Sequence, residues 1–471
     1  MRLLLVYVCD LGSISSPAMI KIQRGVGLLP SLGLMSLATF AEKYTSWQAE
    51  ILDCRLDGLD SSKAASKILA EDWDAVGISC LSHTWPEAWR LAKKLKEAEK
   101  PPAVIMGGPH ATLYPAEVLT HSCVDYVISG EGEIPLQGLL KRLEERRTGG
   151  ELPCADGLDG VMKAGDPLKP PFVVSDLDAL PAVSRKYVRW REYVTIVSKE
   201  NYTTTITSGR GCPFSCNFCW TAGGKKVRRF SPEHVLAEIE QAVELGIREF
   251  FFFDELFTAG RDWVERFCSL LLRRGLHISW DVRSRVDTVS FELLKLMRRA
   301  GCCRVQYGAE SGTDRVLKIL GKGITTAKTR QAIEWTRQAG LVTYADFMLG
   351  APGETEAEML QTIDFAVSLK LDYVHFSVLM LYPFTNFYAQ ALREGLLKSD
   401  VWREYAASPE PRSDFVIPYW TKDYDRAFFD KMASLAYKRV CFRPDYIWRR
   451  LRGLSSWQEL SMCCKAALKL W

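Results

Sequence analysis

The sequence contains no apolar run long enough to cross a bilayer, although 47% of its 471 residues are apolar. It also lacks a secretion signal, because the N-terminal MRLLLVYVCDLG carries one basic residue and only a short apolar run before Asp10. Repetitive or compositionally biased tracts are absent. The net charge of +4 is small for this length and does not indicate a general nucleic-acid-binding protein. These absences predict a globular cytoplasmic protein.

Cysteine, in contrast, is well represented, with 14 residues. Without a secretion signal, so many thiols indicate a reducing compartment, in which cysteines bind metals or pack as small apolar side chains. A chain of this length is also too long for one typical hydrophobic core. We therefore expect two or three domains.

The first part of the chain, residues 1–145, alternates short apolar runs with helical patterns. This alternation predicts an α/β domain with a doubly wound, Rossmann-like parallel sheet, whose ligand lies at the carboxyl ends of the strands. Two of the expected strand ends, GGPH and SGEGE, are small or polar, so that backbone could approach a large ligand closely there. The expected strands are residues 3–8, 49–54, 75–80, 103–108 and 125–130.

The remaining chain divides into three expected parts. Residues 146–198 are rich in Pro, Gly and Asp with little periodicity, which is typical of a linker. Residues 199–397 hold a second series of strands and helices, which predicts a partial (β/α)6 barrel with its chemistry at the strand carboxyl ends. Residues 398–471 are expected to form a helical C-terminal cap. The expected barrel strands are residues 203–207, 249–254, 278–284, 304–310, 342–349 and 373–380.

Three cysteines follow the first barrel strand in SGRGCPFSCNFCW: Cys212, Cys216 and Cys219. A redox-regulatory cluster or half of a zinc site are the ordinary alternatives. A structural zinc site wants four ligands, usually with a second CxxC pair, and none follows at a suitable distance, although Cys302–Cys303 and Cys463–Cys464 exist. Three thiolates can instead hold three irons of a [4Fe–4S] cluster and leave the fourth iron open to a ligand.

The C-x3-C-x2-C spacing, with the aromatic Phe218 before the last cysteine, resembles the radical S-adenosylmethionine (SAM) superfamily. The resemblance implies that the open iron binds SAM and that an electron from the cluster cleaves it to a 5′-deoxyadenosyl radical. It extends through FFFDELFT, WDVRSRVD, YGAESG and FMLGAPGET. For each polar residue alone a structural ion pair is an equal alternative, and their recurrence at successive strand ends favours contacts. The residues implied around SAM are Phe218, Asp254, Glu255, Arg285, Glu310, Ser311, Met348 and Gly350.

The N-terminal domain lacks G-x-G-x-x-G after its first strand, which argues against a dinucleotide site. Its segments LLPSLGLMSLATFAEK, VGISCLSHTWPEAWRLAKKLK, GGPHATLYPAEVL and YVISGEGEIP resemble the cobalamin-binding domain that precedes the barrel in one large radical SAM subfamily. The resemblance implies base-off cobalamin near Ser79, Gly107, Gly108, His110, Gly130 and Glu131. The D-x-H-x-x-G loop that supplies a cobalt ligand in many such domains is absent. We therefore expect His83 to have a polar or packing role and His110 to position backbone, and whether any residue ligates the cobalt stays open.

The C-terminal segment 438–471 carries eight Lys or Arg and two acidic residues, interleaved with Trp448, Trp457 and Trp471. A basic, aromatic, amphipathic segment can lie on an anionic membrane surface, which here would be the inner one. A helix packed on the barrel with a solvated basic face is an equal alternative. RNA binding is not expected, because no RNA-binding module is recognised.

These resemblances imply a cobalamin-dependent radical SAM enzyme with a [4Fe–4S] cluster, SAM and cobalamin as cofactors. The expected reaction is methyl transfer from methylcobalamin to an unactivated carbon of a small-molecule, peptide or lipid-like substrate. We expect a monomer that takes electrons from an external donor such as flavodoxin or ferredoxin. The alternative is rearrangement, cyclisation or oxidation without methyl transfer, as in the anaerobic porphyrin-ester cyclases. A non-catalytic regulator that binds cobalamin or a cluster is a more distant alternative.

Overall fold

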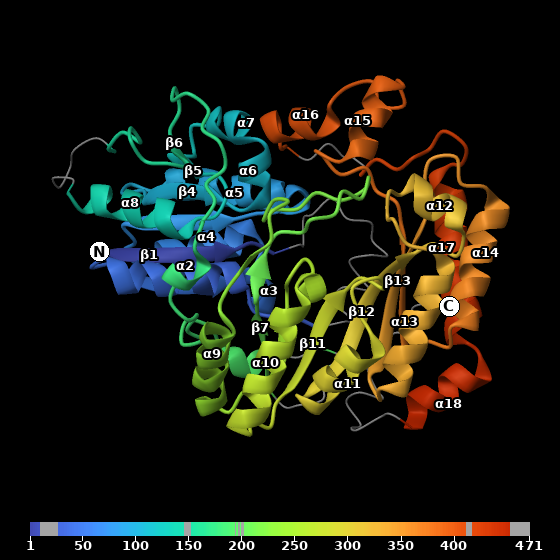
Figure 1. The fold of residues 1–471 in the computed structure, drawn as a ribbon. Coiled ribbons are helices and arrows are strands. Elements are labelled where there is room, and N and C mark those ends of the chain that lie inside the picture. The colour runs from blue at the N-terminus through green and yellow to red at the C-terminus, as the bar shows by residue number, and fades with distance from the viewer. Residues whose placement is uncertain are drawn as a thin grey trace. The chain divides into compact units, whose positions relative to one another are not determined.

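The computed structural model describes residues 1–9, 27–145, 152–193, 195, 198, 202–410 and 417–452, with side chains described as far as 448. The chain forms two compact units. The described parts of unit 1 are residues 1–9, 28–145, 152–193 and 399–410, and those of unit 2 are residues 27, 195, 198, 202–398 and 417–452. Each unit is built around its own sheet (Figure 1).

Unit 1 contains a six-stranded sheet in the order β2-β1-β3-β4-β5-β6. The first five strands are parallel, and the short β6 pairs antiparallel with β5. Because β1 lies between β2 and β3, the strand order reverses there, as it does in doubly wound sheets. The strands are β1 (Arg2–Tyr7), β2 (Gln48–Asp53), β3 (Ala75–Ser79), β4 (Ala103–Gly107), β5 (Tyr126–Ile128) and β6 (Val161–Met162).

Helices cover both faces of this sheet. On one face, α2 (Leu32–Tyr44) and α8 (Glu133–Glu144) pack on the strands in one apolar cluster. On the other face lie α4 (Ser61–Leu69), α5 (Trp85–Lys96), α6 (Pro109–Leu113) and α7 (Pro115–Leu119). Strands buried on both sides are apolar along their whole length, which is why their runs could be recognised in the sequence. The predicted doubly wound domain is confirmed.

Two further segments complete unit 1. Residues 152–193, expected as a linker, contribute β6 and the 3-10 turns Leu177–Ala179 and Trp190–Glu192. From the expected cap, α16 (Val401–Ala407) packs on this unit, where the Trp85 indole N–H donates to the Ala406 carbonyl at 3.2 Å. Tyr405 of α16 belongs to the same apolar cluster as α4 and α5. Both segments thus belong to the core of unit 1.

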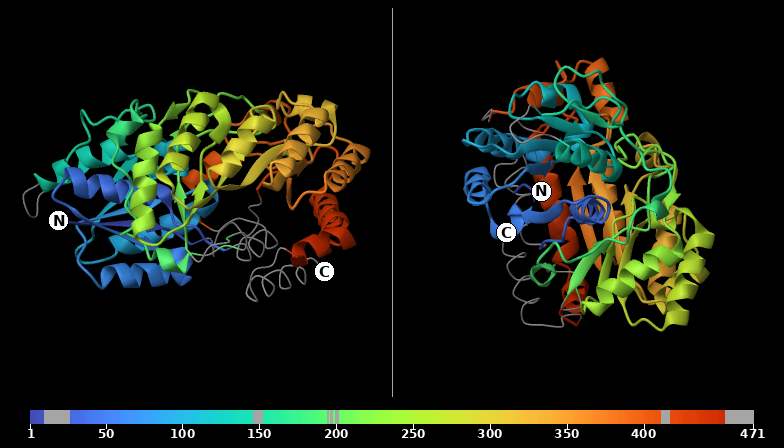
Figure 2. Two further views of the ribbon diagram at one scale, coloured as in Figure 1. Left: turned by 60° about the horizontal axis from the view of Figure 1, so that its bottom comes forward. Right: turned by 90° about the vertical axis from the view of Figure 1, so that its left-hand side faces the viewer.

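Unit 2 contains six parallel strands in the order β14-β13-β12-β11-β10-β7. Neighbouring strands follow one another along the chain, and no pairing of β7 with β14 closes the sheet among the described residues. This is the predicted partial barrel, and Figure 2 shows its strands as one twisted layer beside the helices that follow them. The strands are β7 (Thr203–Ile206), β10 (Glu249–Phe252), β11 (Ser279–Ser284), β12 (Cys302–Glu310), β13 (Val342–Leu349) and β14 (Tyr373–Val378).

Several helices of unit 2 begin after a residue whose side chain caps the first turn. Side-chain oxygens of Ser231, Ser290, Thr325 and Thr355 each accept a backbone N–H of the first turn. No helix of the described chain is long and apolar enough to cross a membrane. The helices are α9 (Pro232–Glu244), α10 (Arg261–Arg274), α11 (Phe291–Arg299), α12 (Asp314–Ile319), α13 (Thr326–Gln338), α14 (Glu356–Ser368), α15 (Asn386–Arg393), α17 (Arg426–Cys441) and α18 (Pro444–Arg452).

The basic segment 438–471 is described only in its first part, which is the end of α17 and α18. Residues 453–471 lie outside the described residues. The prediction that this segment contacts a membrane therefore stays a prediction.

Candidate active site

The cysteine loop follows β7 and is fastened to α12. The Asn217 backbone N–H donates to the Leu320 carbonyl at 2.9 Å, and its side-chain amide donates to the Ile319 carbonyl at 2.8 Å. Gly211, just before the first cysteine, has a φ of +98°. A Cβ there would lie 2.3 Å from the Lys226 carbonyl oxygen, so only glycine permits this turn. The three cysteines therefore stand on a loop of fixed shape.

The three thiols are more accessible than the core cysteines of unit 2. Cys212 and Cys216 are half-buried and Cys219 is exposed, whereas Cys268 and Cys302 are buried. Protein atoms around the Cys219 sulfur, with the charges of Cys216 and Cys212, raise the pKa of its thiol to about 11. The three sulfurs thus lie close enough to interact electrostatically.

The cysteine loop has the number of soft ligands that an iron–sulfur cluster takes. Within the described ranges, no group of three or more His, Cys, Asp or Glu side chains is arranged to hold a metal ion. A zinc ion would require four ligands around one point, whereas a [4Fe–4S] cluster takes one thiolate on each of three separate irons. The three cysteines provide that number of soft ligands.

Two buried cations lie beside the loop. Arg285 has an Nη1 3.9 Å from the Cys216 sulfur, and its guanidinium stacks 3.6 Å from the centre of the Phe214 ring. Lys322 lies 5.8 Å from the centre of the Phe218 ring. Burial opposes the charge of Lys322, but the negative charges of Glu310 and Cys216 outweigh it and raise the pKa of this lysine. Positive charge at this position favours thiolate over thiol.

Arg285 is also held by protein groups. Its guanidinium makes a two-bond ion pair with Asp287, with N–O distances of 2.9 and 3.0 Å. Its Nη2 donates to the Lys322 carbonyl at 2.6 Å. If Arg285 contacts the SAM carboxylate as predicted, its guanidinium must bind that carboxylate and Asp287 at the same time.

The two carboxylates at the end of β10 contact protein groups. Asp254 is 2% exposed and accepts the Ser208 N–H at 2.9 Å and the Ser208 hydroxyl at 2.5 Å. Burial raises the pKa of Asp254, and the charge of Arg229, 3.5 Å away, opposes this shift. Glu255 accepts the backbone N–H of Gly211 at 2.5 Å and that of Gly223 at 3.1 Å. Glu255 therefore ties the cysteine loop to β10, and contact of either carboxylate with SAM stays a prediction.

The end of β12 has an unusual backbone. Glu310 has a φ of +61°, and the register between β12 and β13 shifts just before it. A non-glycine residue in this conformation costs on the order of 1–3 kcal/mol, and such residues cluster at functional sites. The Glu310 carboxylate accepts a hydrogen bond from the Lys322 ammonium at 2.8 Å. The next residue, Ser311, is buried with its hydroxyl 3.1 Å from that of Thr362.

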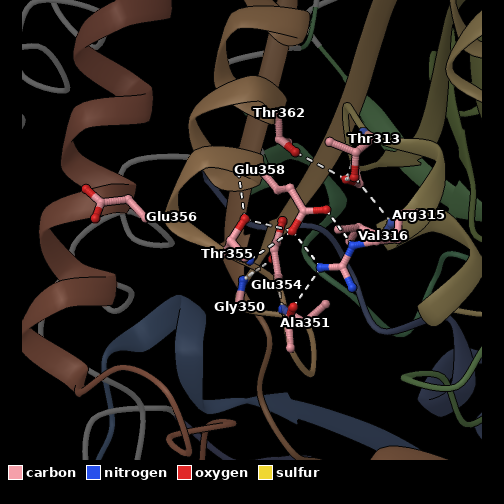
Figure 3. Close-up of polar contacts among 12 residues, drawn as sticks. Thr313, Arg315, Val316, Gly350, Ala351, Glu354, Thr355, Glu356, Glu358 and Thr362 are labelled. Atoms are coloured by element: carbon pink, nitrogen blue, oxygen red, sulfur yellow. Dashed lines mark hydrogen bonds and ion pairs between the residues drawn. The ribbon is translucent and has the colours of Figure 1, made fainter.

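The loop after β13 is held by a buried acid, Glu354, which is not among the predicted site residues. Glu354 is 2% exposed, and its Oε2 accepts the N–H of Gly350 at 2.7 Å and of Ala351 at 2.9 Å (Figure 3). Burial raises the pKa of Glu354 to about 7. Arg315 of α12 reaches the same loop and donates to the Gly353 carbonyl at 2.7 Å.

Of the two residues that the motif implies here, Gly350 has a φ of +89°. The other, Met348, is half-buried on β13. Because of the capping contacts, the backbone of this loop is held in place before any ligand binds.

The residues implied around cobalamin lie at strand ends of unit 1. Ser79 ends β3 and Gly107 ends β4. Gly108 has a φ of +87°, and a Cβ there would lie 2.8 Å from the Ser79 hydroxyl. A Cβ on Gly130 would lie 2.3 Å from the Phe172 carbonyl oxygen, and Glu131 accepts the Val174 N–H at 2.8 Å. Ser79, Gly107 and Gly108 thus lie together, while Gly130 and Glu131 hold the segment around residue 172.

The two histidines near these strand ends differ in position. His83 lies in the 3-10 turn Ser82–Thr84 after β3. His110 is fully buried in α6, stacks on Trp85 with 4.9 Å between ring centres, and has its Nδ1 3.2 Å from the Ser82 hydroxyl. Burial lowers the pKa of His110 to about 3, so the ring is neutral. Its environment suits a packing role.

Comparison with known proteins agrees with this description. Residues 206–366 match the sequence model of the radical SAM superfamily, and residues 23–140 match that of the B12 binding domain. An uncharacterized methyltransferase of Pyrococcus horikoshii is 32% identical over 395 residues, which cover 83% of this chain and 84% of that protein. An anaerobic magnesium-protoporphyrin IX monomethyl ester cyclase of Rubrivivax gelatinosus is 27% identical over 350 residues, covering 72% of this chain and 62% of that protein.

The fold also resembles a solved structure. It matches TsrM, a radical SAM methyltransferase from Kitasatospora setae with cobalamin and a [4Fe–4S] cluster bound, with a TM-score of 0.68. The identity is 18%, and the match covers 83% of this chain and 75% of that chain. Both domain models match in the expected order, and a relative is matched over most of its length. The chain therefore belongs to the radical SAM enzymes that carry an N-terminal cobalamin-binding domain.

Proposed function

We propose that the protein is a C-methyltransferase that acts on an unactivated carbon. The observation that carries this proposal is the presence of both cofactor-binding folds in one chain, with the cysteine loop at a strand end of the second. The relative that the chain covers most fully is named a methyltransferase, which supports methyl transfer over other outcomes. When bound, the cofactors would supply reductive cleavage of SAM, hydrogen abstraction and delivery of a methyl group.

The chain's own residues would bind and orient these groups. Cys212, Cys216 and Cys219 would hold the cluster, and Arg285 and Lys322 would offset its negative charge. The strand ends with Met348 and Gly350 would line SAM, on a loop that Glu354 holds rigid. The strand ends with Ser79, Gly107 and Gly108 would lie against cobalamin. An external flavodoxin- or ferredoxin-like donor would supply the electron.

A second outcome, ring closure without methyl transfer, has a specific observation in its favour. The relative from Rubrivivax gelatinosus is named a cyclase, although the chain covers only 62% of it. The two outcomes leave different products. Both outcomes release 5′-deoxyadenosine, but methyl transfer marks the product with the methyl group of SAM, whereas cyclisation leaves the product unmethylated.

Anaerobic reconstitution with iron, sulfide and hydroxocobalamin tests the proposal. We expect about four irons and one cobalamin per chain, because one [4Fe–4S] cluster and one cobalamin are proposed. With reductant and SAM deuterated at its methyl group, a cell extract should then yield a deuterium-labelled product. Formation of 5′-deoxyadenosine without label would favour the cyclase outcome. Iron without cobalamin would remove the methyl-transfer proposal.

Two exposed cysteines provide a matched pair for the cluster assignment. Cys219 lies in the loop, and Cys154 lies in unit 1. Cys219→Ala should lose the iron and keep the cobalamin, whereas Cys154→Ala should keep both. Full iron content in Cys219→Ala would contradict the assignment.

A further inference from the structure

The inner face of the partial barrel carries polar side chains that the proposal above does not use. Successive side chains of a strand point to opposite faces of the sheet. Trp280 of β11 packs on Phe267 of α10, and Phe347 of β13 packs on Phe365 of α14, so these residues face the helices. Their neighbours along the strands, including Arg283 and Asp346, therefore point to the opposite, inner face.

Asp346 is the centre of a polar group on this face. The Gln306 side-chain amide donates to its Oδ2 at 2.7 Å, and the His375 Nδ1 lies 3.4 Å from its Oδ1. Asp346 and His375 are neighbours in the register of β13 and β14. The His375 side chain is 42% exposed and that of Asp346 is 28% exposed. Because Nδ1 is the ring nitrogen that lies next to Asp346, Nε2 is the nitrogen left for a ligand.

Arg283 lies on the neighbouring strands of the same face. The register of β11 and β12 places it beside Gln306. Its guanidinium stacks 4.6 Å from the centre of the Phe253 ring, which is 41% exposed. The carboxylate nearest along the strand, Asp281, forms its ion pair with the buried Arg304. Across the part of the chain that the structure describes, no carboxylate forms an ion pair with Arg283.

This arrangement suits an anion. A guanidinium already stacked on a ring has little freedom to lose, and it can donate two parallel hydrogen bonds to a carboxylate or phosphate. Aromatic rings continue across the face, where the rings of Tyr344 and Tyr373 lie with centres 6.0 Å apart. A cation, an imidazole and aromatic rings therefore lie on one face, together with the carboxylates of Asp346 and Asp281. Burial raises the pKa of Asp281, and the charges of the nearby arginines, Arg283 among them, lower it.

We propose that the inner face of the barrel binds a small-molecule substrate that carries a carboxylate or phosphate group. Arg283 binds the anionic group, the rings of Phe253, Tyr344 and Tyr373 contact the carbon skeleton, and His375 hydrogen-bonds a second polar group. The inference rests on the proposed function and narrows its substrate. A wholly neutral lipid would leave Arg283 desolvated without a partner, which is unfavourable.

The test measures ligand protection of His375 from diethyl pyrocarbonate in the full-length reconstituted enzyme. The probes are benzoate, phenyl phosphate and the neutral benzamide, and peptide mass spectrometry gives the modification rate at each histidine. His277 is exposed and precedes β11, so it serves as an internal control. We expect benzoate or phenyl phosphate to slow modification of His375 several-fold, with His277 and the benzamide sample unchanged. Protection by only one anion identifies a carboxylate or a phosphate as the group.

Two arginines stacked on phenylalanine form a matched pair. Arg283 stacks on Phe253, and Arg330 of α13 stacks on Phe365 at 5.2 Å. Arg283→Ala should abolish anion protection, Arg283→Lys should retain part of it, and Arg330→Ala should retain it fully. Protection by benzamide, or protection that survives in Arg283→Ala, would overturn the inference.

SAM is tested as a further probe, because its own carboxylate could be the anion that Arg283 binds. If SAM alone protected His375 and Arg283→Ala weakened SAM binding, Arg283 would belong to the cofactor site and the inference would be wrong. Iron content and 5′-deoxyadenosine formation are measured on the same preparations. If the enzyme without substitutions binds no iron or forms no 5′-deoxyadenosine, the proposed function is wrong. If it cleaves SAM but no anion protects His375, this inference alone is wrong.

Discussion

At the scale of single residues, Glu255 shows how one motif position can have two different roles. The family motif implies contact with SAM, but the carboxylate accepts two backbone N–H groups of the cysteine loop, from Gly211 and Gly223. Glu255 is exposed, so water screens these two hydrogen bonds and weakens them. They nevertheless tie the cysteine loop to the end of β10 at two points.

We expect Glu255→Ala to loosen the cluster. Loss of iron to an added chelator should be faster in this variant than in the unmodified protein, Glu255→Gln should be intermediate because its amide oxygen can still accept, and cobalamin content should not change. Glu265→Ala is the control, because Glu265 forms an exposed ion pair with Arg261 on α10. If Glu255→Ala weakened SAM binding and left the rate of iron loss unchanged, the cofactor role would be the better interpretation.

At the scale of elements, the loop between β13 and α14 depends on a buried acid. The pKa of Glu354 is raised by burial from its ordinary value of 4.5 to about 7. Between these two pH values the folded protein binds more protons than the unfolded chain, so the free energy of unfolding must fall as the pH rises. The loss amounts to about 3 kcal/mol, because each pKa unit corresponds to about 1.4 kcal/mol.

Glu354→Gln should remove this pH dependence. Its amide oxygen can still accept the Gly350 and Ala351 N–H groups, but the residue no longer titrates. We expect the free energy of unfolding of the natural protein, relative to the variant, to fall between pH 4.5 and pH 7 and to be constant above that range. Denaturant titrations at several pH values measure it. A constant difference across the window would show that folding does not raise the pKa of Glu354.

Strands were predictable from the sequence where a continuous run of apolar residues indicates that the strand is buried. The apolar runs of β1 and β3 are visible because both faces of each strand are covered, whereas β13 alternates buried and half-buried residues. Their ends were less predictable, since β5 spans only Tyr126–Ile128 of the expected 125–130. The short β6 and α16 carry no strong local signal, because distant partners in unit 1 stabilise them. Packing between segments far apart in the sequence cannot be inferred from the pattern of either one.

The same limit applies to the candidate site. The three cysteines were predictable because their spacing is local. Lys322 was not, because its contact with Glu310 joins a loop to a strand end 12 residues earlier, which no local pattern reports. Arg283 and Arg285 are only two residues apart, yet β11 ends between them. Arg285, beyond the end of the strand, is buried against Asp287. Arg283, still on the strand, stays exposed on the inner face of the barrel.

At the scale of the whole molecule, unit 1 is not continuous in sequence. Its core includes Tyr405, which follows the entire barrel in the chain and is 2% exposed. The Ala406 carbonyl accepts the Trp85 indole N–H and lies 3.0 Å from the His121 Nε2. The cobalamin-binding fold therefore needs residues from both sides of the radical SAM domain. A fragment that stops at residue 193 would lack part of its core.

Tyr405→Ala should consequently affect unit 1 and leave the cysteine loop intact. Removing a buried aromatic side chain costs about 3–5 kcal/mol, and this cost falls on the cluster that includes α5 and β3. After reconstitution we expect the cobalamin content per chain to fall and the iron content to stay unchanged. Arg403→Ala, on the exposed side of α16, should change neither content. Equal loss of iron and cobalamin would mean that the two units unfold together, because damage to the core of one would then have released the ligands of the other.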